Sequence, residues 1–227
     1  LLDEQKTYYE KEKSMVRNAI IDNVSKVGIE KSSFFILQAL TKLRQIANHP
    51  VLVDDDFIHE SGKVVEILRN LESIIDEGHK VLIFSSFVKY LNIIGEALDQ
   101  KGYKYCKLTG ESVNRGKIVE EFQENKSIPV FLISIKAGGV GLNLTAAEYV
   151  FILDPWWNPA AEAQAVNRAH RIGQKNNVFV YRYISTQTIE EKIERLQAKK
   201  AQLAKDFIDE NNPFKLFTKD ELMGLFD

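Results

Sequence analysis

Residues 131–174 read FLISIKAGGVGLNLTAAEYVFILDPWWNPAAEAQAVNRAHRIGQ, and this stretch decides the fold. The apolar run PVFLISI (129–135) predicts a buried strand, and YVFILD (149–154) predicts a second one. A glycine-rich loop, AGGVG, lies between them, and a helix is expected over 159–171. The order of strand, loop, strand and helix is typical of α/β proteins, which bind ligands at the carboxyl ends of their strands.

The same rhythm extends over most of the chain. Three further strands are expected at 80–84, 104–108 and 178–184, and further helices at 61–78, 87–100 and 115–123. Continuous apolar strands separated by helices indicate a sheet that is covered on both faces. We therefore expect an α/β fold of three layers, with a mainly parallel central sheet.

Both ends of the chain have a helical pattern. The charge-rich residues 1–48 predict two helices, and an apolar stripe that begins at Ile189 predicts another. We expect a helical segment over 1–60, the α/β domain over 61–187, and a C-terminal brace helix with a tail over 188–227.

Composition excludes some classes of protein and leaves others open. The chain has 227 residues, of which 44% are apolar and 27% charged, with a net charge of −2. No apolar run approaches the roughly 18 residues of a membrane span, and the scattered histidines lack metal-ligand spacing. The single Cys106 rules out an internal disulfide. A net charge near zero neither predicts nor excludes nucleic-acid binding, so any phosphate contact must be local.

The expected helix over 159–171 has two distinct faces. Gln164, Arg168 and Arg171 lie at i, i+4 and i+7 and share one face. Buried arginine needs a partner, so we expect the two guanidinium groups to face an anion outside the chain, and phosphate suits their planar fork. The alternative is a solvated polar face with surface ion pairs. The other face carries small or apolar residues that allow close packing on the sheet, namely Ala161, Ala165, Ala169 and Ile172.

Further candidates lie where strands end. Ser85-Ser86 and Thr109-Gly110 each follow a strand at the same edge of the sheet, where hydroxyls and free amides can hold phosphates without sequence preference. In the glycine loop, Gly139 and Gly141 allow close approach of a phosphate, or simply form a tight turn. Trp157 could stack on a nucleic acid or cover the helix start, whereas we expect Trp156 to pack.

Several of these segments carry a resemblance to a known family. GHKVLIFSSF is similar to helicase motif IV, ISIKAGGVGLNLTAAEYVFILDPWWNP to motif V with its extension, and QAVNRAHRIGQ to motif VI. The chain resembles, over nearly its whole length, the second RecA-like lobe of the Swi/Snf-type ATPases, the DNA-translocase branch of superfamily 2 helicases. The WNP and RIGQ elements are specific to that branch. Asn167 departs from the pattern, since an acidic residue or glycine is common there.

The resemblance implies a role for each matching residue. Arg171 would be the arginine finger toward ATP on the first lobe, with Arg168 as its partner and Gln164 orienting in the same network. Gly139 and Gly141 would lie near the nucleotide. The backbone groove for double-stranded DNA would be formed by Ser85, Gly110, Ser134, Lys136, Asn143 and Trp157.

The resemblance also implies partners that this chain does not supply. The sequence contains no GxxxxGK[ST] phosphate-binding loop, since Lys136 precedes the glycines instead of following them. It also contains no DEx[HD] acidic motif. We therefore expect ATP and Mg²⁺ to be bound mainly by a first lobe elsewhere in the parent chain, and this chain alone to be inactive. We expect a monomeric motor without membrane contact, inside the cell: in the cytoplasm or nucleoid of a bacterium, or in a eukaryotic nucleus.

Two alternatives remain open at this point. A non-catalytic interaction module could keep the helicase fold without the motor, although intact Gln164, Arg168 and Arg171 argue against it. An RNA-remodelling helicase lobe is the other alternative, and the WNP and RIGQ elements argue against that.

Overall fold

A computed structural model describes residues 1–138, 142–156, 159–170, 174, 176–203 and 224–226. Contacts group the chain into two units, Leu1–Lys63 with Ser185–Asp227, and Val64–Ile184. The predicted three-part division at 60/61 and 187/188 stays a prediction. No helix among the described residues is long and apolar enough to cross a membrane.

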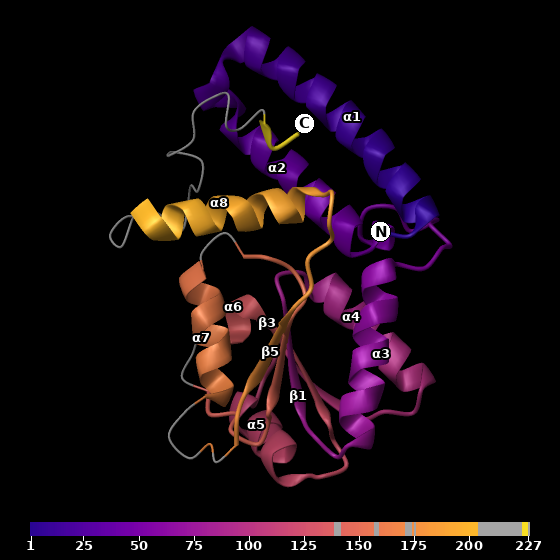
Figure 1. The fold of residues 1–227 in the computed structure, drawn as a ribbon, viewed down its shortest axis with the longest axis vertical. Helices are drawn as coiled ribbons and strands as arrows, with labels where there is room; N and C mark the ends of the chain where they lie inside the picture. The colour runs from indigo at the N-terminus through magenta and orange to yellow at the C-terminus, as the bar shows by residue number, and fades with distance from the viewer. Residues whose placement is uncertain (139–141, 157–158, 171–173, 175, 204–223, 227) are drawn as a thin grey trace. The chain divides into compact units, whose positions relative to one another are not determined.

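The second unit is built around one parallel sheet (Figure 1). Within the described residues it has five strands in the order β2-β3-β1-β4-β5. These strands are β1 (Val81–Ser85), β2 (Tyr105–Leu108), β3 (Val130–Ser134), β4 (Tyr149–Ile152) and β5 (Phe179–Arg182). Each neighbouring pair is parallel, which confirms the expected α/β class.

Helices cover the two faces of this sheet (Figure 1), except at the edge strand β5, whose four residues are exposed. They are α3 (Gly62–Asp76), α4 (Val88–Gln100), α5 (Arg115–Glu124), α6 (Ile135–Gly138) and α7 (Pro159–Ala169). In the figure, α3 and α4 lie on one side of the strands and α6 and α7 on the other. The predicted three-layer arrangement is therefore confirmed.

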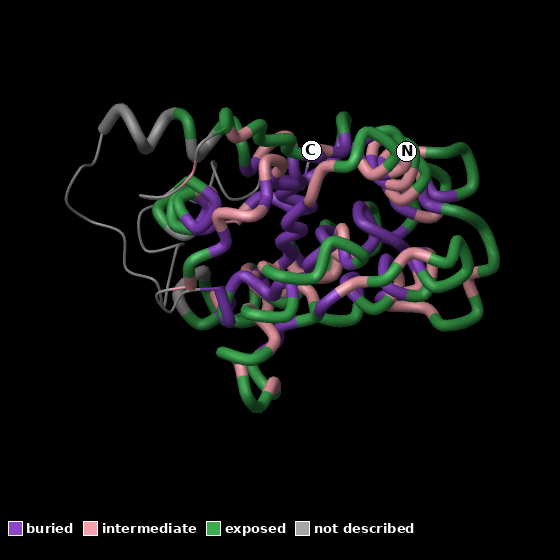
Figure 2. Tube along the Cα trace, turned by 90° about the horizontal axis from the view of Figure 1, so that it is seen from below, coloured by how far each residue is buried: buried purple, intermediate pink, exposed green. Residues whose placement is uncertain are grey.

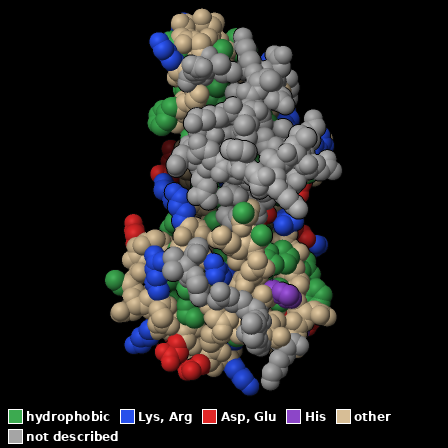
Figure 3. Space-filling model, turned by 90° about the vertical axis from the view of Figure 1, so that its left-hand side faces the viewer, with side chains coloured by type: hydrophobic (Ala, Val, Ile, Leu, Met, Phe, Trp, Pro, Cys, Tyr) green, Lys and Arg blue, Asp and Glu red, His purple; other side chains and the backbone are tan. Residues whose placement is uncertain are grey.

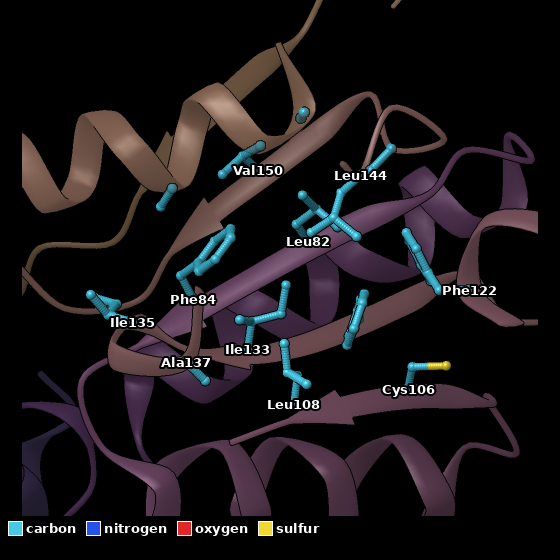
Figure 4. Close-up of a cluster of buried hydrophobic side chains, with 14 of the residues drawn as sticks. Leu82, Phe84, Cys106, Leu108, Phe122, Ile133, Ile135, Ala137, Leu144 and Val150 are labelled. Atoms are coloured by element: carbon cyan, nitrogen blue, oxygen red, sulfur yellow. The ribbon is translucent and has the colours of Figure 1, made fainter. Parts of the chain in front are cut away.

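Alternation along the strands divides their side chains between the two faces. Leu82 and Phe84 of β1, with Ile133 of β3, belong to a buried cluster that also includes Phe122 of α5 and Ala165 of α7. Figure 4 shows the strand side chains of this cluster converging in one layer. Figure 2 shows buried segments inside the trace and exposed ones outside it. Burial of such large side chains stabilises the fold by roughly 1.5–3 kcal/mol each.

The start of the glycine-rich loop differs from the prediction. The strand predicted over 129–135 ends at Ser134, and Ile135 begins the short helix α6. Gly138 is the last residue of this helix and packs closely on the sheet. A Cβ added at this position would lie only 3.1 Å from a ring carbon of Phe84. Close packing, rather than a ligand, therefore explains this glycine.

The first unit is helical. It contains α1 (Asp3–Val27), α2 (Ile29–Asn48), the short 3-10 helix η1 (Pro50–Leu52) and α8 (Ile189–Leu203). Gly28 joins α1 to α2 with φ of +80°, a conformation that glycine adopts at little cost. Tyr9 of α1 accepts a hydrogen bond from the Ile189 amide at 2.7 Å, which ties α1 to the start of α8.

Candidate functional site

The carboxyl edge of the sheet brings the predicted strand-end residues together. Ser85 and Ser134 end β1 and β3, and their Cα atoms are partners in the register of these two strands. Thr109 and Gly110 follow β2, whose Leu108 pairs with Ile133 of β3. The parallel register therefore places all three strand ends at one edge, as the sequence predicts.

Asp154 organises this edge. Its carboxylate accepts a hydrogen bond from the Ser85 hydroxyl at 2.6 Å, and from both the amide and the hydroxyl of Ser86. Asp154 and Ser85 are fully buried, and the Ser85 hydroxyl also accepts from the Phe87 amide at 3.0 Å. The end of β1 is thus fastened to the segment after β4. The sequence pattern gave no sign of this role for Asp154.

The candidate DNA contacts differ in their exposure. Gly110, Lys136 and Asn143 are exposed, so their polar groups are open to an external partner. Ser85 and Ser134 are buried, and the Ser134 hydroxyl accepts from the Ala137 amide at 3.4 Å. In this structure the buried serines hold the loops, and the exposed residues are the ones that can reach a phosphate.

The helix α7 carries two of the three candidate catalytic residues. Gln164 is exposed, whereas Arg168 is only 8% exposed. We expected Arg168 to face outward, but it is buried. The end of α7 lies against the loop before β4, where the Leu144 amide donates to the Arg168 carbonyl at 3.0 Å. The expected small-residue face is confirmed for Ala165 and Ala169, which lie in the buried cluster.

A buried carboxylate holds the segment before α7. Glu162 is 5% exposed and accepts a hydrogen bond from the Trp156 amide at 2.8 Å. Its other oxygen meets Nε of Arg182 at 3.2 Å. Burial raises the pKa of Glu162, while the Trp156 amide and the Arg182 charge act in the opposite direction. Trp156 itself packs against the buried cluster, as predicted.

The side chain of Gln174 reaches back to α7. Its amide group donates to the carbonyls of Ala147 at 2.9 Å, Thr145 at 3.1 Å and Ala169 at 3.3 Å. Our reading of the sequence missed this role, because a single polar residue after a helix carries no periodic signal.

Four predicted site residues, Gly139, Gly141, Trp157 and Arg171, lie outside the described residues, and their roles stay predictions. The side of the second unit on which α7 lies is seen in Figure 3. Lys and Arg side chains there are scattered among neutral and acidic atoms, without a continuous basic patch among the described residues. Within the described ranges, no group of three or more His, Cys, Asp or Glu could hold a metal ion.

Comparison with curated proteins finds relatives among DNA repair proteins. The family model for the helicase conserved C-terminal domain matches residues 63–173. The mouse protein "DNA excision repair protein ERCC-6-like" is 49% identical over 179 residues, which make up 77% of this chain. This chain spans 14% of the length of that protein and of its bovine and human counterparts.

Solved structures give a match over nearly the whole chain. The C-terminal domain of the SWI2/SNF2 ATPase of Sulfolobus solfataricus is 34% identical, with a TM-score of 0.80, over 99% of this chain and 93% of that one. The core of the SWI2/SNF2 ATPase from the same organism, solved in complex with double-stranded DNA, matches with a TM-score of 0.81 and 34% identity. That match covers 98% of this chain and 47% of the core.

Proposed function

This chain belongs to the SWI2/SNF2 family of ATPases, as a C-terminal domain of that family, and from this we propose that it is the second lobe of an ATP-dependent motor that translocates on double-stranded DNA. The observation that carries the proposal is the ordered carboxyl edge of the sheet, where Asp154, after β4, holds the end of β1. A lobe of this kind supplies groups to a site that a first lobe completes.

We assign the catalytic contribution to α7 and the residues after it. The guanidinium groups of Arg171 and Arg168 would compensate the negative charge that develops on the transferring γ-phosphoryl group, and Gln164 would orient them. Arginine fingers of this type contribute about 10³–10⁵ to the rate. Arg168 is only 8% exposed in this structure, so we expect its surroundings to change when the first lobe docks.

We assign the phosphate cradle and Mg²⁺ to that first lobe, elsewhere in the parent protein. Gly139 and Gly141 would contact the nucleotide from this side. ATP supplies the free energy for lobe closure, and this polypeptide alone is expected not to hydrolyse it. Turnover by the isolated chain would contradict this assignment.

The DNA groove would run along the carboxyl edge of the sheet. Gly110 and Lys136 are exposed at this edge and Asn143 is exposed on the loop that leads to β4, and we propose that they contact the phosphate backbone together with Trp157. Ser85 and Ser134 would contribute through the loops that their hydroxyls hold. Contacts to phosphates position a protein without reading bases, so translocation would show little sequence preference. The motor would act inside the cell, wherever DNA is held.

ATPase rates measured with different nucleic acids test this function. We expect the full-length protein to hydrolyse ATP slowly alone and at least tenfold faster with duplex DNA. Single strands and RNA should stimulate it less. Preferential stimulation by RNA would instead favour an RNA-remodelling lobe. Turnover that no nucleic acid changes would indicate that the fold serves another purpose.

A further inference from the structure

Gln174 joins two segments that are distant along the chain. Its Nε2 atom lies within hydrogen-bond distance of the Thr145 and Ala147 carbonyls, which belong to the loop before β4. It also reaches the Ala169 carbonyl at 3.3 Å, at the last residue of α7. Its Oε1 atom accepts from the Asn176 amide at 3.0 Å, which fixes the orientation of the side chain.

This link closes the C-terminal end of α7. The last carbonyls of a helix have no partner within the helix and need an outside donor. The Ala169 carbonyl receives one from Gln174, and the Arg168 carbonyl receives one from the Leu144 amide at 3.0 Å. Leu144, Ala147 and Ala169 are all fully buried, so water cannot easily replace these bonds.

The two segments held together are those assigned to different partners. The helix α7 leads into Arg171, whereas the loop that Gln174 grips follows Asn143, a candidate DNA contact. A rigid connection between them would set how the end of α7, with Arg168 in its last turn, is held against the sheet. An arginine finger depends on such placement, because misplacement by about 1 Å can cost about 10²-fold in rate.

We propose that Gln174 is a positioning residue: its amide fixes the end of α7, and with it Arg168, to the loop that precedes β4. This inference rests on the proposed function and adds to it a residue that touches neither ATP nor DNA.

The chain offers a matched control for this role. Gln123 of α5 holds the same loop from another side, since its Oε1 atom accepts from the Ala146 amide at 2.9 Å. Replacing Gln123 loosens the loop without releasing α7. Gln174→Met and Gln123→Met remove one amide each and keep an unbranched side chain of similar length.

Steady-state kinetics of the full-length protein with saturating duplex DNA provide the first readout. We expect Gln174→Met to lower kcat at least tenfold while KM for ATP stays within threefold, because the arginines act mainly in the transition state. Gln123→Met should keep kcat within twofold. If Gln174→Met keeps kcat within twofold of the wild type, the proposal is wrong.

Hydrogen exchange provides a readout that does not depend on activity. In Gln174→Met, the amides of Leu144 and His170 should exchange at least tenfold faster than in the wild type, since they lie on the two sides of the link. In Gln123→Met, faster exchange should be confined to the loop around Ala146. Unchanged protection at both Leu144 and His170 in Gln174→Met would overturn the proposal even if the motor proved inactive on DNA.

A third variant covers the case in which Gln174→Met fails to fold. Gln174→Glu keeps the shape but sets a carboxylate against three carbonyl oxygens at neutral pH. Protonation restores a donor, so its kcat relative to the wild type should rise at least threefold between pH 8 and pH 6. A ratio that stays flat with pH would contradict a positioning role for the amide. A wild type without DNA stimulation would count against the proposed function instead.

Discussion

At the scale of single residues, Asp154 is the group that holds the carboxyl edge of the sheet. It is fully buried and accepts hydrogen bonds from the hydroxyls of Ser85 and Ser86 and from the Ser86 amide. A carboxylate suits this position because it accepts at both oxygens and donates at neither. An amide in its place would turn a donor toward other donors.

We therefore expect Asp154→Asn to lower the free energy of unfolding by about 2–3 kcal/mol, since hydrogen bonds to a charged acceptor are lost and a donor is left buried. Chemical denaturation followed by circular dichroism measures the change. Ser86→Ala is the matched control and should cost about 1 kcal/mol, because it removes one donor. A loss below about 0.5 kcal/mol in Asp154→Asn would show that the edge does not depend on this carboxylate.

Glu162 makes stability depend on pH. Burial raises its pKa in the folded protein, so the folded state binds its proton more tightly than the unfolded state. The stability of the wild type should therefore fall, relative to Glu162→Gln, as the pH rises from about 4 through the raised folded value. Ionised Glu162 also pairs with Arg182, but the Arg182 side chain is 55% exposed. This ion pair therefore offsets little of the destabilisation that comes from burying the charged carboxylate. The opposite trend in pH-dependent denaturation would contradict the burial argument.

At the scale of elements, a buried ion pair within the first unit joins Lys63 to Glu190 of α8. Nζ of Lys63 lies 2.7 and 2.6 Å from the two carboxylate oxygens of Glu190, and 2.7 Å from the side-chain oxygen of Asn48. The two side chains are 4% and 0% exposed. The Ser185 amide also donates to Glu190, at 2.9 Å. The segments that enter and leave the second unit are thus joined within the first.

Removing one partner of this pair leaves a buried charge without its counter-ion. We expect Lys63→Met to lower the free energy of unfolding by about 3–5 kcal/mol. The double variant Lys63→Met/Glu190→Gln should lose less than the two single variants together, because the second change removes the unpaired charge. A double-mutant cycle by denaturant titration tests this. Strict additivity would mean that the two groups act independently.

The elements show which kinds of structure the sequence could predict. The strands β1, β3 and β4 were expected because continuous apolar runs signal strands that are buried on both faces, whereas β5, also expected from its apolar residues, is an exposed edge strand. The helix α6 was missed because its residues are too few for a helical period to emerge. Lys63 and Glu190 are separated by 127 positions, and no local pattern links residues so far apart. Arg168 was expected to face outward because its spacing shows only which helical face it shares.

At the scale of the whole molecule, the fold class followed from the alternation of strands and helices. The strand order did not, because parallel apolar strands have no pattern that selects their neighbours. The candidate site also has a part that the sequence predicts and a part that it does not. Strand-end residues could be located because parallel strands share one carboxyl edge. Asp154 and Glu162, which hold segments at this edge, and Gln174, which holds the end of α7 to the loop before β4, depend on contacts that only the folded chain makes.

The proposed backbone contacts predict how the binding of duplex DNA by the full-length protein depends on salt. Its affinity for duplex DNA should fall linearly on a plot of log K against log salt, with a slope of about −0.9 for each phosphate neutralised. Duplexes of unrelated sequence should bind within about threefold of one another, because phosphates carry no sequence information. Fluorescence anisotropy at 50 and 200 mM salt checks both expectations. Equal affinity at the two salt concentrations would argue against a phosphate-tracking groove.

The most direct test of this lobe as half of a DNA-driven motor is the duplex-stimulated ATPase rate of full-length protein with Arg171→Ala, beside the wild type. We predict that the variant loses about 10³-fold or more in kcat while it still binds duplex DNA, because the charge on the γ-phosphoryl group is no longer compensated. A variant that keeps the wild-type rate would contradict the central claim that this lobe completes the ATP site.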